Sequence, residues 1–540
     1  MKAIPFAAVL TAAWLAAVAS IAIAAPVKTD SGLVEGTIEG NLAVYRGIPF
    51  AAPPVGELRW RAPQPIAKWS GVGKADKFAK ACMQAVVPNA VLGSAAPTVS
   101  EDCLYLNVWS PATSPAGKLP VMVWIYGGGF IAGATSTPLN SGEQLAKKGV
   151  VVVSIAYRVG PMGFFAHPAL SAESPQKVSG NYGLLDQIAG LQWVQKNIAA
   201  FGGDPKRVTI FGESAGAIAV SMLGASPLAK GLFAGAISQS GGSFGPPRTP
   251  PESGENVQLL AAAERDGVRI AQKLNAISAA DLRKASPDDF SRVGAGALNM
   301  SWPVLDGWVL PDDQYKLYAA GKYNSTPVLI GINSDEGALF PASGSAETYA
   351  AGVRKRYGPH ADAILGAYPA DPVNWMQSSR DLMRDAGFGW QTWAWADLQT
   401  KSDATRSGKS KAFVYYFNHS PPRIEGSRFK NAVGAVHTEE MIYVFDHLGQ
   451  SNLPWTDSDH AMADAMSTYW TNFAKHGDPN GPGVSEWPAY SSATLATMHF
   501  NDVPQAGPVA NLAKLKVLDA YFAWRRTPEG AKFGSSKQPR

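Results

Sequence analysis

The sequence predicts an α/β protein in which a central, mostly parallel β-sheet is flanked by helices. Continuous apolar runs occupy residues 119–126 and 150–156, and runs of this length are typical of buried strands. Residues 184–200 instead carry apolar side chains at helical spacing and stop before a Gly-Gly-Asp-Pro segment. Because strands and helices alternate along the chain, we expect helices on both faces of the sheet.

The other elements follow in order along the chain. Residues 33–45 alternate apolar and polar positions around Gly36 and Gly40, which is typical of a β-hairpin. Further elements are predicted as strands at residues 207–211, 326–332 and 412–417 and as a helix at residues 217–223.

The composition is that of a large globular protein of 540 residues. Hydrophobic residues make up 46% and charged residues 17%, which excludes a wholly disordered chain. The net charge of +4, from 47 basic and 43 acidic residues, is too small to indicate a nucleic-acid partner. The sequence contains no metal-binding motif and no cysteine–histidine cluster, so neither a metal nor a cofactor is expected.

The N-terminus has the features of a secretory leader. Lys2 precedes an apolar stretch over residues 4–23, which ends in small residues that suit a cleavage site. We therefore predict a signal peptide at residues 1–25, one mature domain at residues 26–540, and export to a periplasm or the medium. The alternative is an uncleaved anchor. No later stretch is apolar for long enough to insert in a membrane.

The two cysteines, Cys82 and Cys103, lie in the part that we expect to be exported. An even pair in an oxidising compartment indicates one disulfide. It would close a loop of about 20 residues and stabilise the fold by about 3 kcal/mol. The alternative is two buried free thiols.

A serine lies at the turn between the strand at 207–211 and the helix at 217–223. The turn reads Gly212-Glu213-Ser214-Ala215-Gly216. Such a turn strains the backbone of its serine, so the residues two positions away must be very small. The following helix start favours developing negative charge beside the hydroxyl. Ser214 is therefore the candidate nucleophile, and a Gly-rich β-turn is the alternative.

Three consecutive glycines, residues 127–129, follow an earlier predicted strand. Glycines in succession allow backbone N–H groups to point at an oxyanion. The candidate donors are the amides of Gly128, Gly129 and Ala215. On their own the glycines also fit a flexible loop, but the serine turn favours the catalytic interpretation.

Four motifs lie at residues 45–51 (YRGIPFA), 100–108 (SEDCLYLNV), 124–130 (WIYGGGF) and 211–216 (FGESAG). They resemble those of the type-B carboxylesterases, the α/β-hydrolase group that contains cholinesterases and bacterial carboxylesterases. The likeness covers nearly the whole mature chain. It implies an α/β-hydrolase fold, a disulfide between Cys82 and Cys103, and the chain order serine, acid, histidine.

His437 is the candidate base among eight histidines. It lies in Gly-Ala-Val-His-Thr-Glu-Glu at residues 434–440, which matches the Gly-x-x-His-x-x-Glu loop of that family. It would take the proton from Ser214 and later protonate the leaving alcohol.

The resemblance places the acid at Glu336, just before a glycine that follows the predicted strand at 326–332. The acid would fix the tautomer of the histidine and stabilise the imidazolium. Asp335 is the runner-up, and Asp306 is expected in a turn. Two supporting residues also follow from the resemblance, Glu213 beside the nucleophile and Ser240 near the acid. A structural role is the alternative for each.

The sequence restricts the ester less strongly than the reaction. The segment inside the predicted disulfide loop has no aromatic residue for a quaternary ammonium group. Arg423, Arg428 and Lys430 precede His437 and suit an ester with carboxylates on its acyl part. A solvated basic loop is the alternative. The stretches at residues 227–233 and 240–249 resemble bacterial members that remove tricarballylic acid side chains from a long amphipathic amine.

Other functions stay open at this point. A broad carboxylesterase or lipase for neutral aliphatic or aryl esters is the first alternative. A catalytically dead adhesion module of the neuroligin type shares the fold, but such proteins typically lose the serine that this chain retains. The partner we expect is a small-molecule ester, and the sequence predicts no oligomeric state.

Overall fold

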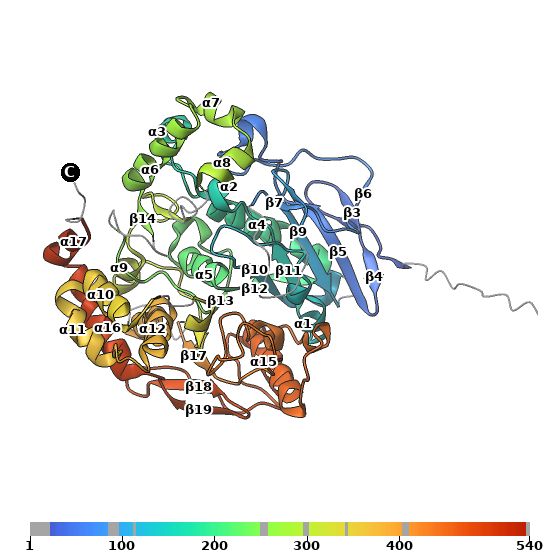
Figure 1. Cartoon of the computed structure of the whole chain (residues 1–540). Coiled ribbons are helices and arrows are strands. Elements are labelled where there is room, and N and C mark those ends of the chain that lie inside the picture. Colours follow the sequence, from blue (N-terminus) through green and yellow to red (C-terminus); the bar gives the residue numbers. More distant parts are fainter. Residues whose placement is uncertain are drawn as a thin grey trace, which may run out of the picture.

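A twelve-stranded β-sheet forms the centre of the protein (Figure 1). The computed structural model describes residues 22–84, 97–111, 115–248, 257–294, 302–340, 344–401 and 410–535. In order across the sheet, the strands are β1 (Ala22–Ile23), β4 (Thr37–Glu39), β5 (Leu42–Pro49), β9 (Tyr105–Ser110), β11 (Val151–Ile155), β10 (Leu119–Ile125), β12 (Gly203–Glu213), β13 (Gly235–Gln239), β16 (Val328–Asn333), β17 (Ala412–Phe417), β18 (Ala496–Phe500) and β19 (Pro504–Pro508).

Seven neighbouring strands, from β11 to β18, run parallel, and the strands outside them pair antiparallel. Val123 of β10 lies opposite Val153 of β11 and Ile210 of β12, and all three are fully buried. Consecutive β-branched residues suit strands that are covered on both faces. The predicted α/β class with a mostly parallel sheet is confirmed.

Helices cover both faces of this sheet (Figure 1). The fully buried α5 (Ala215–Ala225) packs on β12 and β13, and α13 (Trp390–Lys401) packs on β16 and β17. On the other side α15 (Asp457–His476) packs on β10 and β12. A Thr456–Asp459 capping box begins α15, and the left-handed Gly477 ends it.

The remaining helices surround this core as α1 (Glu143–Lys147), α2 (Gly160–Phe164), α3 (Pro168–Glu173), α4 (Tyr182–Asn197), α6 (Leu260–Lys273), α7 (Ala279–Lys284), α8 (Pro287–Gly294), α9 (Gln314–Ala319), α10 (Ala346–Tyr357), α11 (Ala361–Ala367), α12 (Trp375–Arg384), α14 (Met441–Val444), α16 (Leu512–Arg525) and α17 (Pro528–Ser535). Trp60, Phe165 and Phe290 centre a second apolar cluster where α6, α7 and α8 meet α2 and α3. None of the helices within the described ranges is long and apolar enough to cross a membrane.

The predicted hairpin at residues 33–45 is shorter than expected. Only β4 and β5 form a hairpin in the central sheet. Leu33–Glu35 (β3) joins a separate sheet with β2 (Val27–Lys28) and β6 (Val72–Lys74). The strand run is divided at Gly36, where an added Cβ would approach the Val44 carbonyl to 2.2 Å. Short pairs also form between β7 (Ala81–Cys82) and β8 (Val99–Ser100) and between β14 (Gln258–Leu259) and β15 (Val304–Leu305).

The predicted leader is only partly described. Residues 1–21 lie outside the described ranges, whereas Ala22–Ile23 forms the edge strand β1 beside β4. The proposed boundary at residue 25 thus falls just after a two-residue strand.

Candidate active site

The predicted nucleophile lies at a strained turn between β12 and α5. Ser214 has φ 55° and ψ −123°, a backbone conformation that non-glycine residues rarely adopt. An added Cβ at Gly212 would approach Gly216 to 2.6 Å, and one at Gly216 would approach the Ile125 carbonyl to 2.0 Å. Both neighbours must therefore be glycine for the turn to close. The turn holds Ser214 at the carboxyl end of the parallel strands.

A chain of hydrogen bonds joins three of the predicted residues. His437 Nε2 lies 2.9 Å from Ser214 Oγ, and His437 Nδ1 lies 2.5 Å from Glu336 Oε2. His437 is 2% exposed and Glu336 fully buried, so water competes little for either bond. The structure thus brings serine, imidazole and carboxylate together in the order that the sequence predicted.

The Glu336 carboxylate is held on its other side as well. The Ser240 hydroxyl donates to Glu336 Oε1 at 2.5 Å, and the Asn333 N–H donates to the same oxygen at 2.8 Å. Ser240 follows β13 directly, and its N–H donates to the Gly331 carbonyl. With two bonds on Oε1 and the imidazole on Oε2, the carboxylate has little rotational freedom.

The runner-up acid, Asp335, has a different task. Its Oδ2 accepts from the Val433 N–H at 3.0 Å, and its N–H donates to the Ala435 carbonyl at 2.8 Å. The hydroxyl of Ser334 accepts from the Ala435 N–H at 2.9 Å. These bonds fasten the segment before His437 to the end of β16. Asp306 accepts from the N–H groups of residues 308–310, as expected of a turn residue.

Two more glutamates lie buried around His437. Glu213 Oε1 is 3.2 Å from His437 Nε2. Glu440 accepts from the side-chain amides of Asn333 at 2.6 Å and Gln239 at 3.1 Å. Glu440 is the last residue of the Gly-x-x-His-x-x-Glu match, so the sequence contained a signal for it. Asn333 and Gln239 had no local signal, because their partners are more than 100 residues away.

Burial and charge shift the pKa values of this group. Burial raises the pKa of Glu213 to about 8 and that of Glu440 to about 7. For His437, burial alone lowers the pKa, but Glu213 and then Glu336 outweigh it and raise the pKa to about 10. Strongly shifted pKa values among buried titratable neighbours are typical of functional sites.

The predicted oxyanion donors lie beside the serine turn. Gly128 and Gly129 have φ of 104° and 62°, which favour glycine. The Gly128 carbonyl accepts from the N–H groups of Ile131 and Ala132, so the Gly129 N–H of the same peptide plane points the opposite way. An added Cβ at Gly127 would lie 3.1 Å from Ser214 Cβ. The glycine loop and the serine are therefore in contact.

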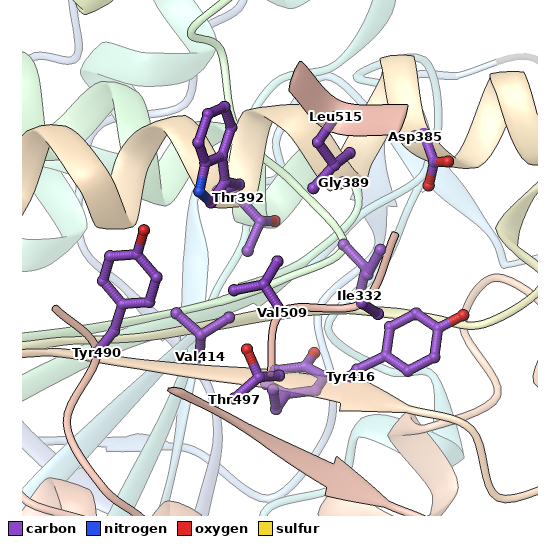
Figure 2. A pocket seen from close by; sticks show the side chains of 13 residues that line it. Ile332, Asp385, Gly389, Thr392, Val414, Tyr416, Tyr490, Thr497, Val509 and Leu515 are labelled. Carbon is purple, nitrogen blue, oxygen red and sulfur yellow. The ribbon is translucent and has the colours of Figure 1, made fainter. Parts of the chain in front are cut away.

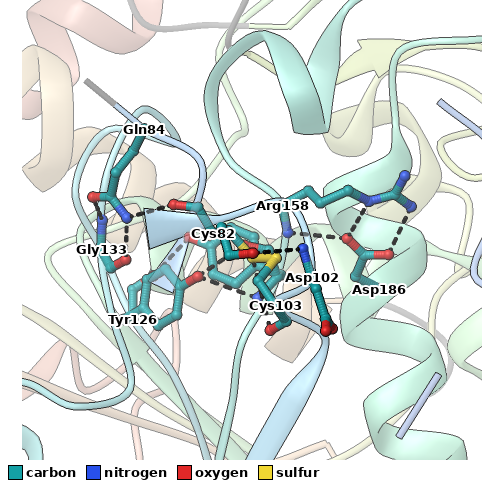
Figure 3. The surroundings of a disulfide bond; sticks show 10 residues. Cys82, Gln84, Asp102, Cys103, Tyr126, Gly133, Arg158 and Asp186 are labelled. Atoms are coloured by element: carbon teal, nitrogen blue, oxygen red, sulfur yellow. Dashed lines mark hydrogen bonds and ion pairs between the residues drawn. A yellow bond between two sulfur atoms is a disulfide. The ribbon is translucent and has the colours of Figure 1, made fainter. Parts of the chain in front are cut away.

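The disulfide segment braces the same loop (Figure 3). Cys82 and Cys103 are bonded, as predicted. Two residues on, the Gln84 side chain donates to the Gly133 carbonyl at 2.8 Å and accepts from the Gly133 N–H at 2.9 Å. Residues 85–96, within the aromatic-free segment, lie outside the described ranges.

The three basic residues before His437 do not act as a set. Both carboxylate oxygens of Glu439 pair with the Arg423 guanidinium, which also donates to the Gly434 carbonyl at 2.9 Å. Arg428 and Lys430 are exposed, with Arg428 over the ring of Phe429 at 4.4 Å. No ion pair within the described ranges joins either of them to an acid. Arg423 therefore has a structural partner in Glu439, which lies 16 residues farther along the chain and could not be inferred from the sequence. Arg428 and Lys430 face solvent.

Two aromatic rings, which the sequence did not indicate, flank the imidazole. The Phe388 ring stacks on His437 with centroids 4.9 Å apart and an interplanar angle of 28°. Phe340 lies 5.8 Å from the imidazole at 52°. The site thus combines one polar side, which carries the carboxylates, with an apolar side.

The fold and this site define a serine hydrolase of the α/β-hydrolase type, and the comparisons with known proteins agree. A family model described as "Carboxylesterase family" matches residues 24–517. The chain is 40% identical over 485 residues to the fumonisin B1 esterase of Sphingopyxis macrogoltabida, covering 86% of this chain and 84% of the relative. It is 36% identical to the para-nitrobenzyl esterase of Bacillus subtilis, covering 87% and 94%.

A solved PNB esterase structure superposes with a TM-score of 0.79 at 32% identity, covering 91% of this chain and 99% of that structure. The protein therefore belongs to the carboxylesterase family, and it is a carboxylic-ester hydrolase.

Proposed function

We propose that this hydrolase acts through an acyl-enzyme on Ser214. The Ser214–His437–Glu336 hydrogen-bond chain carries this proposal. As Ser214 Oγ bonds to the ester carbonyl carbon, its proton moves to His437 Nε2. His437 then gives that proton to the leaving alkoxide as the C–O bond breaks. Water repeats the sequence on the acyl-enzyme and releases the acid and free Ser214.

Two features would lower the barrier. The amides of Gly128, Gly129 and Ala215 would donate to the carbonyl oxygen as it becomes negative, and each such donor typically contributes about 10²–10³ in rate. Glu336 would fix His437 with Nδ1 protonated, so that Nε2 faces the serine. Ser240 and Asn333 hold Glu336 in this orientation.

For the substrate, we propose an ester with free carboxylates on its acyl part, such as the tricarballylic esters of fumonisin B1. The exposed guanidinium of Arg428 and the exposed ammonium of Lys430 support this, because they precede His437 on a segment that Asp335 fastens to the end of β16. The 40% identity to a fumonisin B1 esterase is a second, independent support. Arg423 leaves the proposed carboxylate site, because Glu439 occupies its guanidinium.

A neutral aliphatic or aryl ester is the second candidate. The rings of Phe340 and Phe388 beside His437 favour it, because they give the site an apolar wall. The identity to a para-nitrobenzyl esterase is compatible with the same class of substrate.

Steady-state hydrolysis of fumonisin B1 and of p-nitrophenyl acetate distinguishes the two candidates. We expect a higher kcat/KM for fumonisin B1, and a loss of about tenfold for that substrate alone when Arg428→Ala and Lys430→Ala are combined. Arg61→Ala, which removes an exposed arginine paired with Glu173 outside this segment, is a charge control. Equal losses on both esters, or efficient turnover of the neutral ester alone, would return the substrate to the second candidate.

The domain limits and the location are part of the proposal. A signal peptide at residues 1–25 would be removed on export to a bacterial periplasm or the medium, leaving the catalytic domain at residues 26–540. The Cys82–Cys103 disulfide supports an oxidising location. N-terminal sequencing of the protein secreted by its bacterial host tests the boundary. A chain that keeps residues 1–25 would contradict it.

A further inference from the structure

The helix that faces His437 contains an irregular turn. Helices α12 and α13 are continuous through a π-turn at Asp385–Gly389, where the backbone stays right-handed but each turn takes in an extra residue. Single π-turns inside α-helices are rare and occur often at functional sites. The extra residue changes which side chains face the sheet.

A buried ion pair fixes this turn. Asp385 is fully buried and accepts from Arg384 Nε at 2.8 Å and from the Tyr368 hydroxyl at 3.0 Å. Arg384 Nη1 also donates to the Ser334 carbonyl at 3.0 Å. Ser334 lies two residues before Glu336. The π-turn is therefore tied to the segment that carries the acid.

A small cavity lies on the far side of the turn. Asp385 and Gly389 border a cavity of about 30 Å³, together with Ile332, Val414 and Leu515 (Figure 2). An added Cβ at Gly389 would be in van der Waals contact, at 3.4 Å, with Asp385, Ile332 and Leu515. Hydrogen bonds to Asp385 thus hold the turn at the border of this small cavity.

The residue that the turn presents to the site is Phe388. Its side chain is 3% exposed, and its ring stacks on His437 as described above. An aromatic face attracts a cation, and an imidazolium within about 6 Å of a ring is in the favourable range. Phe340 is farther away and tilted, so it offers no comparable face.

We propose that Phe388, held by the Asp385 π-turn, is a positioning residue for His437. Its ring fixes the imidazole plane between Ser214 and Glu336 and stabilises the imidazolium that forms when Ser214 loses its proton. This inference rests on the proposed acyl-enzyme function. It concerns the base alone, and no substrate contact is required of Phe388.

The test replaces Phe388 with residues of similar volume in the full chain. Phe388→Met keeps an apolar side chain without a ring, and Phe388→Tyr keeps the ring. Glu213, Glu336 and Glu440 face the imidazole from three other segments and stay unchanged in both variants. We expect Phe388→Met to lower kcat about three- to tenfold with KM nearly unchanged. The acid limb of the kcat/KM profile should move to lower pH, and Phe388→Tyr should restore both readouts.

The possible outcomes distinguish failure of this inference from failure of the acyl-enzyme proposal. A Phe388→Met enzyme with parental kcat and pH profile would overturn the inference. If that variant fails to fold, Tyr368→Phe tests the same device by removing one donor to Asp385. A lower kcat at constant KM would support the inference, and a parental kcat would overturn it. Turnover retained by Ser214→Ala would instead overturn the acyl-enzyme proposal itself, whatever Phe388 does.

Discussion

At the scale of single residues, one imidazole lies among three buried carboxylates. Glu213 and Glu336 contact His437, and Glu440 lies behind them. A carboxylate stabilises the imidazolium and so raises the pKa of His437. At low pH His437 therefore stays protonated and cannot act as a base. We therefore expect kcat/KM to keep rising as the pH increases from neutral toward about 10, because only neutral His437 accepts the serine proton.

The Glu213→Gln variant tests this electrostatic account. Among the charges that raise the pKa of His437, Glu213 has the largest effect. A neutral amide in its place should let the imidazole lose its proton at lower pH. The acid limb of the kcat/KM profile should move toward lower pH. Glu440→Gln should move it in the same direction by less. A shift to higher pH in either variant would contradict the assignment of these charges.

Glu336→Gln and Asp335→Asn separate the two adjacent acids. Because Glu336 contacts Nδ1 of His437, its amide should disturb the tautomer and lower kcat by on the order of 10³–10⁴-fold. Asp335→Asn keeps an oxygen that can accept from the Val433 N–H, so we expect less than about a tenfold loss. Steady-state kinetics of the two purified variants decides. The reverse order would move the acid to Asp335.

Residues with a local signature could be predicted from the sequence. Ser214 could be recognised from the glycines two positions before and after it, and His437 from the short motif that contains it. Gln239 and Asn333 could not be found in this way, because their amides meet Glu440 only after the strands pair. The pairing of Arg423 with Glu439 could not be predicted for a similar reason. Charge near a catalytic residue does not reveal whether a partner such as Glu439 already binds it.

At the scale of elements, the segment at residues 421–440 carries the base without a strand or a long helix to hold it. Asp335, Ser334 and the Arg423–Glu439 pair fasten it instead. Glu439 Oε2 also accepts from the Val436 N–H at 2.7 Å. The loop is therefore positioned by polar contacts on both sides of His437.

Removal of one fastening should weaken the loop. Arg423→Ala would leave Glu439 partly buried without its cation, and we expect the free energy of unfolding to fall by about 1–2 kcal/mol. The kcat should fall along with it. Arg428→Ala, from the same segment but exposed, should stay within about 0.5 kcal/mol of the parent. Urea unfolding of both variants measures the difference. Equal free energies of unfolding would show that the Arg423–Glu439 pair does not stabilise the loop.

The predicted limits of helices and strands agree best with the observed limits where the elements are buried. The strand predicted at residues 412–417 is observed as β17 with the same limits. The hairpin failed because alternation indicates a strand but not its partner, and the chain changes sheets at Gly36. The π-turn has no pattern in the sequence, since Asp385 meets Tyr368 and Arg384 meets the Ser334 carbonyl only in the folded chain.

At the scale of the whole molecule, the parallel strands deliver the parts of the site to one edge of the sheet. The glycine loop follows β10, the serine turn follows β12, and the acid follows β16. Distant segments then brace these parts, including the disulfide segment through Gln84 and Gly133 (Figure 3). Changes far along the chain should therefore alter both stability and rate.

A double Cys82→Ser and Cys103→Ser variant tests this coupling. Loss of a cross-link that closes a loop of about 20 residues should lower the free energy of unfolding by about 3 kcal/mol. The kcat should also fall, because Gln84 would brace Gly133 less firmly. Guanidinium unfolding and steady-state kinetics measure the two effects. As a control, a reductant should destabilise the parent but not the variant, and an unchanged parent would argue against the disulfide.

The most direct measurement of the central claim is intact mass spectrometry during turnover of a slowly deacylated ester. A rapid acid quench should trap a species heavier by one acyl group. Digestion should place that group on Ser214, and Ser214→Ala should show neither the adduct nor turnover. An adduct on another residue, or full turnover by Ser214→Ala, would contradict the account of this protein as a serine esterase that acts through Ser214.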